Sequence, residues 1–143
     1  GAISGKYCFM PGDVVYSKIR PYLRKAILAE FQGLCSADMY PLRPMQNVTS
    51  GYLHMLILGE HFSRFAEAVS ERSGFPKINR QEMSEYLLVL PELSEQLRIE
   101  GVFSTLADLQ RENTQQLAKL LRLKAGLMQD LLSGRVSVAE LAK

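Results

Sequence analysis

The sequence lacks long apolar runs and is poor in cysteine. No stretch of its 143 residues approaches the roughly 18 consecutive apolar residues of a membrane-spanning helix, so we expect no membrane partner. Cys8 and Cys35 are the only cysteines, and their spacing fits neither a zinc motif nor a disulfide framework. We predict that each is a small buried residue in a reducing compartment, and therefore expect a cytoplasmic protein.

The residue patterns of common catalytic and cofactor sites are missing as well. No acidic residue stands two positions before any lysine, which removes a common nuclease arrangement of carboxylate and lysine. The GxGxxG and GxxxxGK[ST] loops that hold nucleotides are absent, and so is the GxSxG motif of hydrolases. His54 and His61 lack the further ligands that a zinc site needs. We therefore predict no catalytic residue, no metal site and no cofactor.

The composition and the distribution of charge indicate a folded domain with one basic region. Hydrophobic residues make up 47% of the chain and charged residues 22%, ordinary values for a globular protein. The net charge is only +2, yet the first 25 residues contain five cations and a single acid, Asp13. The cations are Lys6, Lys18, Arg20, Arg24 and Lys25. This local excess predicts one surface that faces an anion. Because the chain opens without an initiator methionine, we expect it to be part of a longer protein.

Periodicity divides the chain into three regions and predicts an α+β fold. The first region, up to residue 44, favours a turn at 11–13, short strands over 14–16, 25–29 and 39–42, and a proline-fixed loop over 19–22. The second favours a helix capped by Thr49 or Ser50 and ended by Gly59, a helix over 60–70, a capping box from Asn79 to Glu82, and a strand over 86–90. The third favours one long helix that begins at Ser94 and ends at Ser133-Gly134.

The long helix carries an apolar stripe suited to a coiled coil. Its length of roughly 60 Å, at about 1.5 Å per residue, exceeds what a small domain can cover. In a heptad register the stripe consists of Ile99, Val102, Leu106, Leu109, Leu120, Leu123 and Leu127, with Asn113 and Gln116 at its middle. A buried polar residue such as Asn113 can fix the register of two helices. We predict a partner helix, and a helix that covers the sheet of its own domain is the alternative.

Residues 17–25 form a basic loop. Four cations and Tyr22 are grouped there around Pro21. Such cations release counterions from DNA phosphates, and an arginine can donate two hydrogen bonds to the edge of one guanine. A solvated basic face of a strand pair explains the residues equally well. Lys77 and Arg80 form a second, weaker basic point, where an ordinary exposed loop is the favoured interpretation.

Five stretches resemble, in the same order, segments of the specificity subunits of type I restriction–modification enzymes. These stretches are residues 11–25, 35–44, 74–78, 90–99 and 123–134. The fourth departs from the family's Pro-Pro-Leu-x-Glu-Gln pattern, because Glu92 stands in place of the second proline. Family members carry two target-recognition domains joined by two long helices that pack antiparallel. The resemblance implies a non-catalytic subunit that recognises a split site on double-stranded DNA and positions the methylation and restriction subunits there.

The resemblance also implies how this chain is organised. We expect part of a DNA target-recognition domain over 1–91, a long coiled-coil helix over 92–134 and a C-terminal tail over 135–143. Because the second helix is missing from this sequence, we expect a homodimer through the long helix. The residues predicted to contact DNA are Lys18, Arg20, Tyr22, Arg24, Lys25 and Lys77. A structural coiled-coil adaptor without DNA readout, or a small DNA-modifying enzyme domain, are the alternatives.

Overall fold

The computed structural model describes residues 5–70, 75–88 and 90–141 and confirms the α+β class. The chain divides into two units, residues 1–100 and residues 101–143. The first unit contains the strands β1 to β5, the helices α1 to α3 and the beginning of α4. The second contains the rest of α4 and the short helix α5 (Val138–Leu141). Within the described residues, no helix combines the length and the apolar character needed to cross a membrane.

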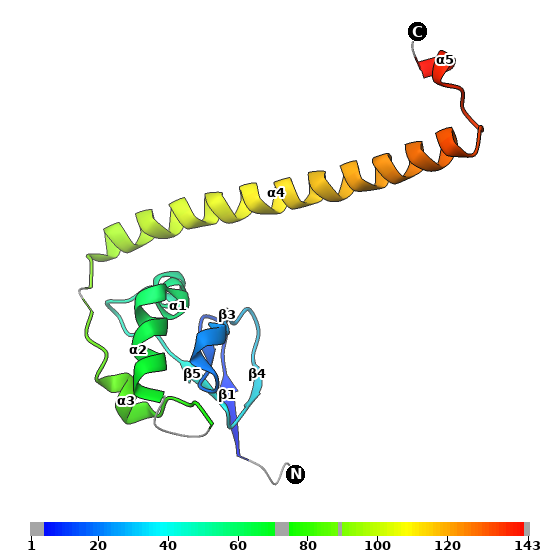
Figure 1. Cartoon of the computed structure of the whole chain (residues 1–143). Coiled ribbons are helices and arrows are strands. Elements are labelled where there is room, and N and C mark those ends of the chain that lie inside the picture. The colour runs from blue at the N-terminus through cyan, green and yellow to red at the C-terminus, as the bar shows by residue number, and fades with distance from the viewer. Residues whose placement is uncertain (1–4, 71–74, 89, 142–143) are drawn as a thin grey trace. The chain divides into compact units, whose positions relative to one another are not determined.

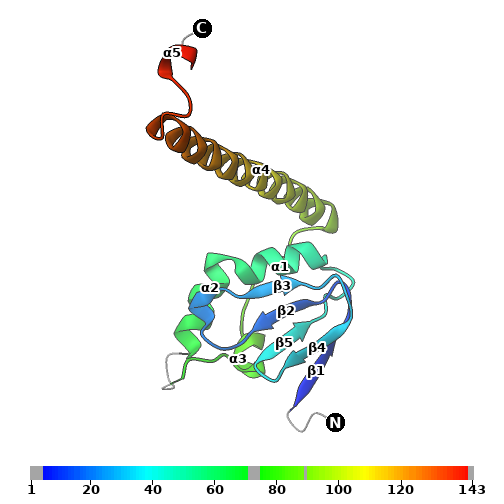
Figure 2. The same ribbon diagram turned by 90° about the vertical axis from the view of Figure 1, so that its right-hand side faces the viewer.

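The strands form two small antiparallel sheets. β2 (Val14–Ser17) lies between β3 (Ala26–Leu28) and β5 (Met39–Leu42), as the β-branched and aromatic residues of its sequence favour. β1 (Lys6–Phe9) pairs with β4 (Gly33–Ser36). Both strands of this second sheet contact β5, next to which Figure 2 shows them. The three predicted strands are therefore confirmed to within two residues, whereas β1 and β4 were not predicted.

A tight turn carries the chain from the second sheet into the first. The Asp13 amide donates to the Met10 carbonyl at 3.1 Å, and Pro11 and Gly12 stand at the two central positions. Gly12 has a φ of 87°, the left-handed value that the third position of a type II turn requires. The turn predicted at residues 11–13 is confirmed.

The helices of the first unit begin where their capping residues predict. The Thr49 side chain accepts a hydrogen bond from the Tyr52 amide at the start of α1 (Ser50–Leu58), and α2 (Glu60–Ser70) follows directly after Gly59. Asn79 and Glu82 form the predicted capping box at α3 (Arg80–Ser84), with reciprocal hydrogen bonds of 2.9 and 2.8 Å. Figure 1 shows α1 and α2 on one side of the strands.

The central strand β2 contributes to two hydrophobic clusters because its side chains alternate between the two faces of the sheet. Tyr16 packs towards the helices, in a cluster completed by Tyr40, Ile57, Phe62, Ala66 and Ile78. Val15 packs on the other face with Phe9, Ala29 and Cys35. The ring of Phe62 meets Tyr16 and Tyr86 edge-on, at centroid distances of 5.5 and 5.1 Å. The burial predicted for Cys35 is confirmed.

Two predictions for this unit are wrong. Cys8 is exposed because Tyr7 and Phe9, the residues on either side of it in β1, point inward. The strand predicted over 86–90 is absent from the described residues 86–88 and 90, and Val89 lies outside the described part of the chain. The Tyr86 amide instead donates to the Met83 carbonyl in the turn that follows α3, and its ring packs against helix α2. An apolar run becomes a strand only where a sheet edge can pair with it, and this run has none among the described residues.

The long helix α4 spans Leu93–Leu132, one residue before the predicted N-terminal cap and up to the predicted stop. After its end, the Arg135 amide donates to the Asp130 carbonyl, and Gly134 adopts a φ of 68°. Both features are typical of a glycine-terminated helix. The long helix of the predicted fold class is therefore confirmed.

Candidate nucleic-acid interface

The structure brings the two basic segments of the sequence together. The Ile78 amide donates to the Lys18 carbonyl at 3.0 Å, and the Arg20 amide donates to the Pro76 carbonyl at 2.9 Å. Between these two hydrogen bonds, Ile19 and Lys77 form an isolated antiparallel bridge. The basic loop after β2 and the segment before α3 are therefore held together as a short strand pair. We call residues 18–25, together with Lys77 and Arg80, the basic surface.

The loop that carries most of this charge has a fixed shape. Pro21 is buried and begins the 3₁₀ turn η1 (Pro21–Leu23), which lies between Arg20 and Arg24. Both arginines have left-handed backbones, with φ values of 50° and 45°. The turn is closed by the Leu23 amide on the Arg20 carbonyl and by the Arg24 amide on the Pro21 carbonyl. At the end of the loop, the Ser17 amide donates to the Lys25 carbonyl at 2.9 Å, so the loop backbone is anchored at both ends.

Several cations of the basic surface lie over aromatic rings. Lys18 Nζ is 5.2 Å from the centroid of the Tyr40 ring, and the Arg80 guanidinium carbon is 5.3 Å from the same centroid. That guanidinium is also 5.5 Å from the centroid of Tyr7. Arg20 lies 5.9 Å from the centroid of Phe75. Such contacts hold a cation in place without neutralising it.

Burial shapes the electrostatics of Tyr40. It raises the pKa of the phenol, and the nearby Arg80 guanidinium opposes this effect only in part. The Tyr40 ring therefore stays neutral at physiological pH. It supports Lys18 and Arg80 without becoming a counterion for either of them.

Among the described residues, no carboxylate forms an ion pair with a cation of the basic surface. Within the described residues, the ion pairs involve Arg43, Arg64, Arg111 and Arg135. None of them includes a cation of the basic surface, and the side chains of Arg20, Tyr22, Arg24, Lys25 and Lys77 are exposed. An anion can therefore approach these groups without first displacing a carboxylate.

The predicted DNA-contact residues do not form a single patch. Lys18, Arg20 and Lys77 belong to the strand pair described above. Arg24 and Lys25 instead line a shallow pocket of about 310 Å³ together with Val15, Ser17, Ala26, Ile27 and Met39. Val15 and Ser17 alternate along β2 with Tyr16, so this pocket lies on the face of the sheet that points away from the cluster containing Tyr40. Tyr22, whose side chain is 52% exposed, lies on η1 between the two groups.

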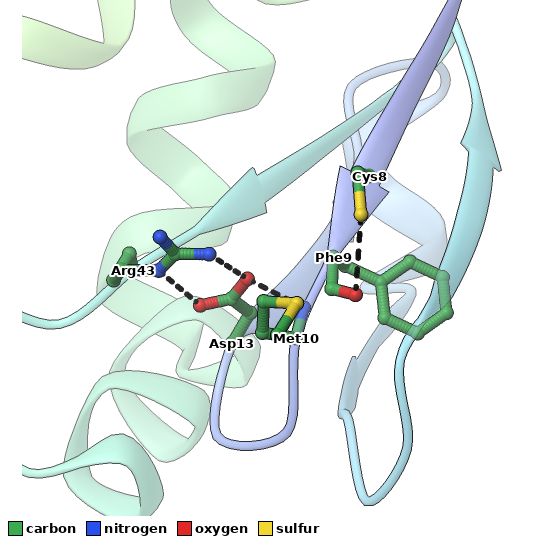
Figure 3. Close-up of polar contacts among 5 residues, drawn as sticks. All are labelled: Cys8, Phe9, Met10, Asp13 and Arg43. Carbon is green, nitrogen blue, oxygen red and sulfur yellow. Dashed lines mark hydrogen bonds and ion pairs between the residues drawn. The ribbon is translucent and has the colours of Figure 1, made fainter.

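An ion pair between the buried Asp13 carboxylate and the exposed Arg43 side chain holds the turn that leads into β2 (Figure 3). The Asp13 carboxylate accepts hydrogen bonds from Arg43 Nε and Nη2, both at 2.9 Å, and from the Met10 amide at 2.9 Å. The Arg43 guanidinium, helped by the Met10 amide, lowers the pKa of Asp13 although burial acts in the opposite direction. Arg43 is therefore a structural cation and lies outside the basic surface.

The predicted helix-interface residues are mostly accessible in this structure. Ile99 is partly buried in the first unit. The other apolar members of the stripe, Val102, Leu106, Leu109, Leu120, Leu123 and Leu127, are between 42% and 61% exposed, and Asn113 is exposed as well. No contact among the described residues tests their predicted pairing with another helix.

Sequence reasoning missed the aromatic partners of the basic surface. Tyr7, Tyr40 and Phe75 come from segments far apart in the chain, and only the fold places them beside Lys18, Arg20 and Arg80. It also missed Gln96, which is fully buried although it is polar. Gln96 is the last residue of the Pro-Pro-Leu-x-Glu-Gln pattern, but nothing in that pattern indicates its burial. The environment of these residues is made by other parts of the chain.

Comparison with known proteins gives a consistent result. No model of a known protein family matches the chain. The Escherichia coli type I restriction enzyme EcoDI specificity subunit is 33% identical over 141 residues, which cover 96% of this chain and 31% of that protein. This match agrees with the resemblance found in the sequence.

Two solved structures share the fold. The HsdS subunit from Thermoanaerobacter tengcongensis superposes with a TM-score of 0.70 at 23% identity, covering 84% of this chain and 32% of that one. A structure described as the basis of complex assembly and conformational transition of the type I R-M system gives a TM-score of 0.61 at 22% identity. It covers 90% of this chain and 32% of that one. The chain spans about a third of the length of each of these proteins. By sequence and by fold, the chain is a homologue of part of the specificity subunits of type I restriction enzymes.

Proposed function

We propose that the chain is a DNA-recognition segment of a type I specificity subunit. The single observation that carries this proposal is the basic surface, in which backbone hydrogen bonds join two distant basic segments. In the part of the chain that the structure describes, no cation of this surface forms an ion pair with a carboxylate. Homology to specificity subunits supports the same conclusion. In this role the segment binds double-stranded DNA in the cytoplasm and performs no catalysis of its own.

The geometry suits the loop of the basic surface to two kinds of DNA contact. Arg20, Arg24 and Lys25 have exposed side chains on a loop of fixed shape, so little ordering of the backbone is needed when they meet phosphates. Each cation that neutralises a phosphate releases condensed counterions, which makes binding depend on salt. The planar donors of an exposed arginine can also read the edge of a guanine. The loop therefore combines affinity for the backbone with the means to recognise a base.

The long helix supplies the assembly function of the proposed subunit. Its stripe of exposed apolar residues is favourable to bury, because each Leu or Ile side chain is worth about 1.5–3 kcal/mol when it leaves water. In a complete complex we propose that the helix packs on a second long helix and helps to position the methylation and restriction subunits. For this sequence alone, a second copy of the chain in an antiparallel homodimer is the simplest partner.

A salt titration of DNA binding tests the recognition proposal. Replacing Arg20, Arg24 and Lys25 together by Ala should weaken binding to a short mixed-sequence duplex. It should also reduce the slope of log K against log salt by about 0.9 for each phosphate contact that is lost. Fluorescence anisotropy between about 50 and 200 mM salt measures both quantities.

A charge-matched control separates local contacts from net charge. Replacing Lys119, Arg122 and Lys124 by Ala removes the same charge from exposed positions on α4, and the salt slope should stay near that of the unmodified chain. If both triple variants lower the slope equally, or if neither does, the basic surface is not the DNA-binding site. The second of these results would favour a structural adaptor.

A further inference from the structure

We propose that Gln96 and Glu100 are positioning residues that couple the first turns of α4, through α1 and β3, to the basic loop over residues 17–25, which we call the DNA-contact loop. This inference rests on the proposed DNA-binding function. It goes beyond that function because neither residue belongs to the basic surface. Both lie within residues 1–100, which form one unit with the strands and with α1.

Gln96 ties the start of α4 to the segment before α1. Its side chain is 0% exposed, and each of its polar atoms is satisfied. Nε2 donates to the Asn47 carbonyl at 3.0 Å and to the Pro91 carbonyl at 2.8 Å, while Oε1 accepts from the Thr49 amide at 3.0 Å. A buried amide with all of its hydrogen bonds made fixes one geometry, because any displacement leaves buried polar groups without partners.

Glu100, one turn later, caps the N-terminus of α1. Its Oε1 accepts a hydrogen bond from the Tyr52 amide at 2.9 Å and another from the Thr49 hydroxyl. A carboxylate at this position also interacts favourably with the helix dipole. The approach depends on Gly51, because a Cβ at that residue would lie 2.5 Å from Glu100 Oε2. The N-terminus of α1 is therefore shaped to receive a side chain from α4.

From α1 the connection continues to the basic surface. His54, on α1, makes a 3.3 Å hydrogen-bond contact from Nε2 to the carbonyl of Ala26, the first residue of β3. Ala26 directly follows Lys25, whose carbonyl accepts the Ser17 amide and so closes the DNA-contact loop. Ala26 and Leu53 also pack against the same hydrophobic cluster. A chain of hydrogen bonds and packed residues therefore runs from Glu100 to Lys25.

The function of this connection follows from linkage. If the position of the loop depends on the position of α1, then contacts that stabilise the first turns of α4 favour the DNA-binding conformation of the loop. In return, bound DNA must strengthen the stabilising contacts at the first turns of α4 by the same factor. A packing partner of the long helix could in this way influence DNA affinity without touching DNA.

Removing Glu100 tests the coupling because two mechanisms predict opposite results. Glu100→Ala deletes a negative charge, and electrostatics alone would strengthen the binding of a polyanion. Loss of the positioning contact should instead weaken DNA binding about fivefold or more, the lower end of typical coupling between sites. Glu112→Ala removes the same charge from an exposed position on α4 and serves as the matched control.

Two further variants separate positioning from overall folding. Glu100→Gln retains an acceptor oxygen for the Tyr52 amide and should lose less affinity than Glu100→Ala. Gly51→Ala displaces the carboxylate without any change of charge and should weaken DNA binding as Glu100→Ala does. Affinity for a mixed-sequence duplex is measured by anisotropy well below the unfolding temperature of each variant. Amide exchange at Tyr52 and Ile27 should be slowed by DNA in the unmodified chain, and less so in Glu100→Ala.

The outcomes distinguish the two proposals. If the unmodified chain shows no salt-dependent DNA binding, the proposed function itself fails. If it binds DNA, but Glu100→Ala and Gly51→Ala bind as tightly as Glu112→Ala, the coupling is overturned and Glu100 is only a helix cap. Should Glu100→Ala fail to fold, the comparison of Gly51→Ala with the unmodified chain decides the question.

Discussion

The buried Asp13 carboxylate gives the first unit a pH-dependent share of its stability. Asp13 is 2% exposed and accepts three hydrogen bonds, two from the Arg43 guanidinium and one from the Met10 amide. Asp13→Asn keeps the shape and one acceptor but removes the charge. Hydrogen bonds to a charged group contribute about 1.5–3 kcal/mol, and because Arg43 faces solvent we take the lower part of this range, about 2 kcal/mol, as the cost of the change.

The sign of the pH dependence follows from the lowered pKa of Asp13. A carboxyl group whose pKa is lower in the folded state contributes its full stabilisation above the pKa of the unfolded chain, about 3.9. That contribution is lost as the pH falls through the lower pKa of the folded state. The unmodified chain should therefore be more stable than Asp13→Asn at neutral pH, and the difference should shrink in acid.

Tyrosine fluorescence provides the measurement. All six tyrosines lie within residues 1–100 and the chain has no tryptophan, so the signal reports on the first unit without the helical signal of α4. At pH 7 we expect the melting temperature of Asp13→Asn to be about 10 °C lower, since each kcal/mol shifts a domain of this size by roughly 4–8 °C. Asp38→Asn, a change at an exposed position, should have little effect.

Two results would refute this reasoning. One is an Asp13→Asn variant as stable as Asp38→Asn at neutral pH, because the three hydrogen bonds would then contribute nothing beyond what asparagine supplies. The other is a difference in melting temperature that stays constant down to about pH 3, because the loss could then not come from the charge of the carboxylate.

The remaining predictions concern packing and assembly. Phe62→Ala removes the buried ring that meets Tyr16 and Tyr86 edge-on and should lower the free energy of unfolding by about 3–5 kcal/mol. Urea unfolding followed by tyrosine fluorescence measures this loss, and a loss below about 1 kcal/mol would contradict the central place of the ring. Leu106→Asp together with Leu120→Asp should shift the chain from dimer towards monomer in analytical ultracentrifugation, because the two charges interrupt the apolar stripe. An unmodified chain that is monomeric at tens of micromolar would contradict the proposed pairing.

Features set by neighbouring residues could be predicted from the sequence. The turn at 11–13 depends on Pro11 and Gly12. The starts of α1 and α3 depend on Thr49 and Asn79, whose side chains accept hydrogen bonds from amides three residues away. The long helix has an apolar repeat and no proline between its ends. In each case the interaction that decides the structure lies within a few residues of the signal.

Features set by distant contacts could not be predicted. The run over 86–90 has the residues of a strand, but Tyr86 turns into the aromatic cluster beside Phe62. β1 and β4 are only four residues long, and each becomes a strand through pairing with the other. Of the candidate site, the cations of the loop could be found from sequence. The contact of Lys18 with the Tyr40 ring could be found only from the fold. The same holds for the position of Arg24 in a pocket on the opposite face of the sheet.

The left-handed backbones of Arg20 and Arg24 place stability and charge in opposition. A residue with a Cβ in this conformation costs roughly 1–2 kcal/mol, whereas glycine adopts it freely. Glycine at either position would therefore relieve the backbone and remove a cation of the loop that we propose to contact DNA. Variants selected for heat resistance alone would gather glycine at these two positions, and variants selected for DNA binding would retain arginine. At this loop the most stable sequence and the sequence best suited to recognition are different sequences.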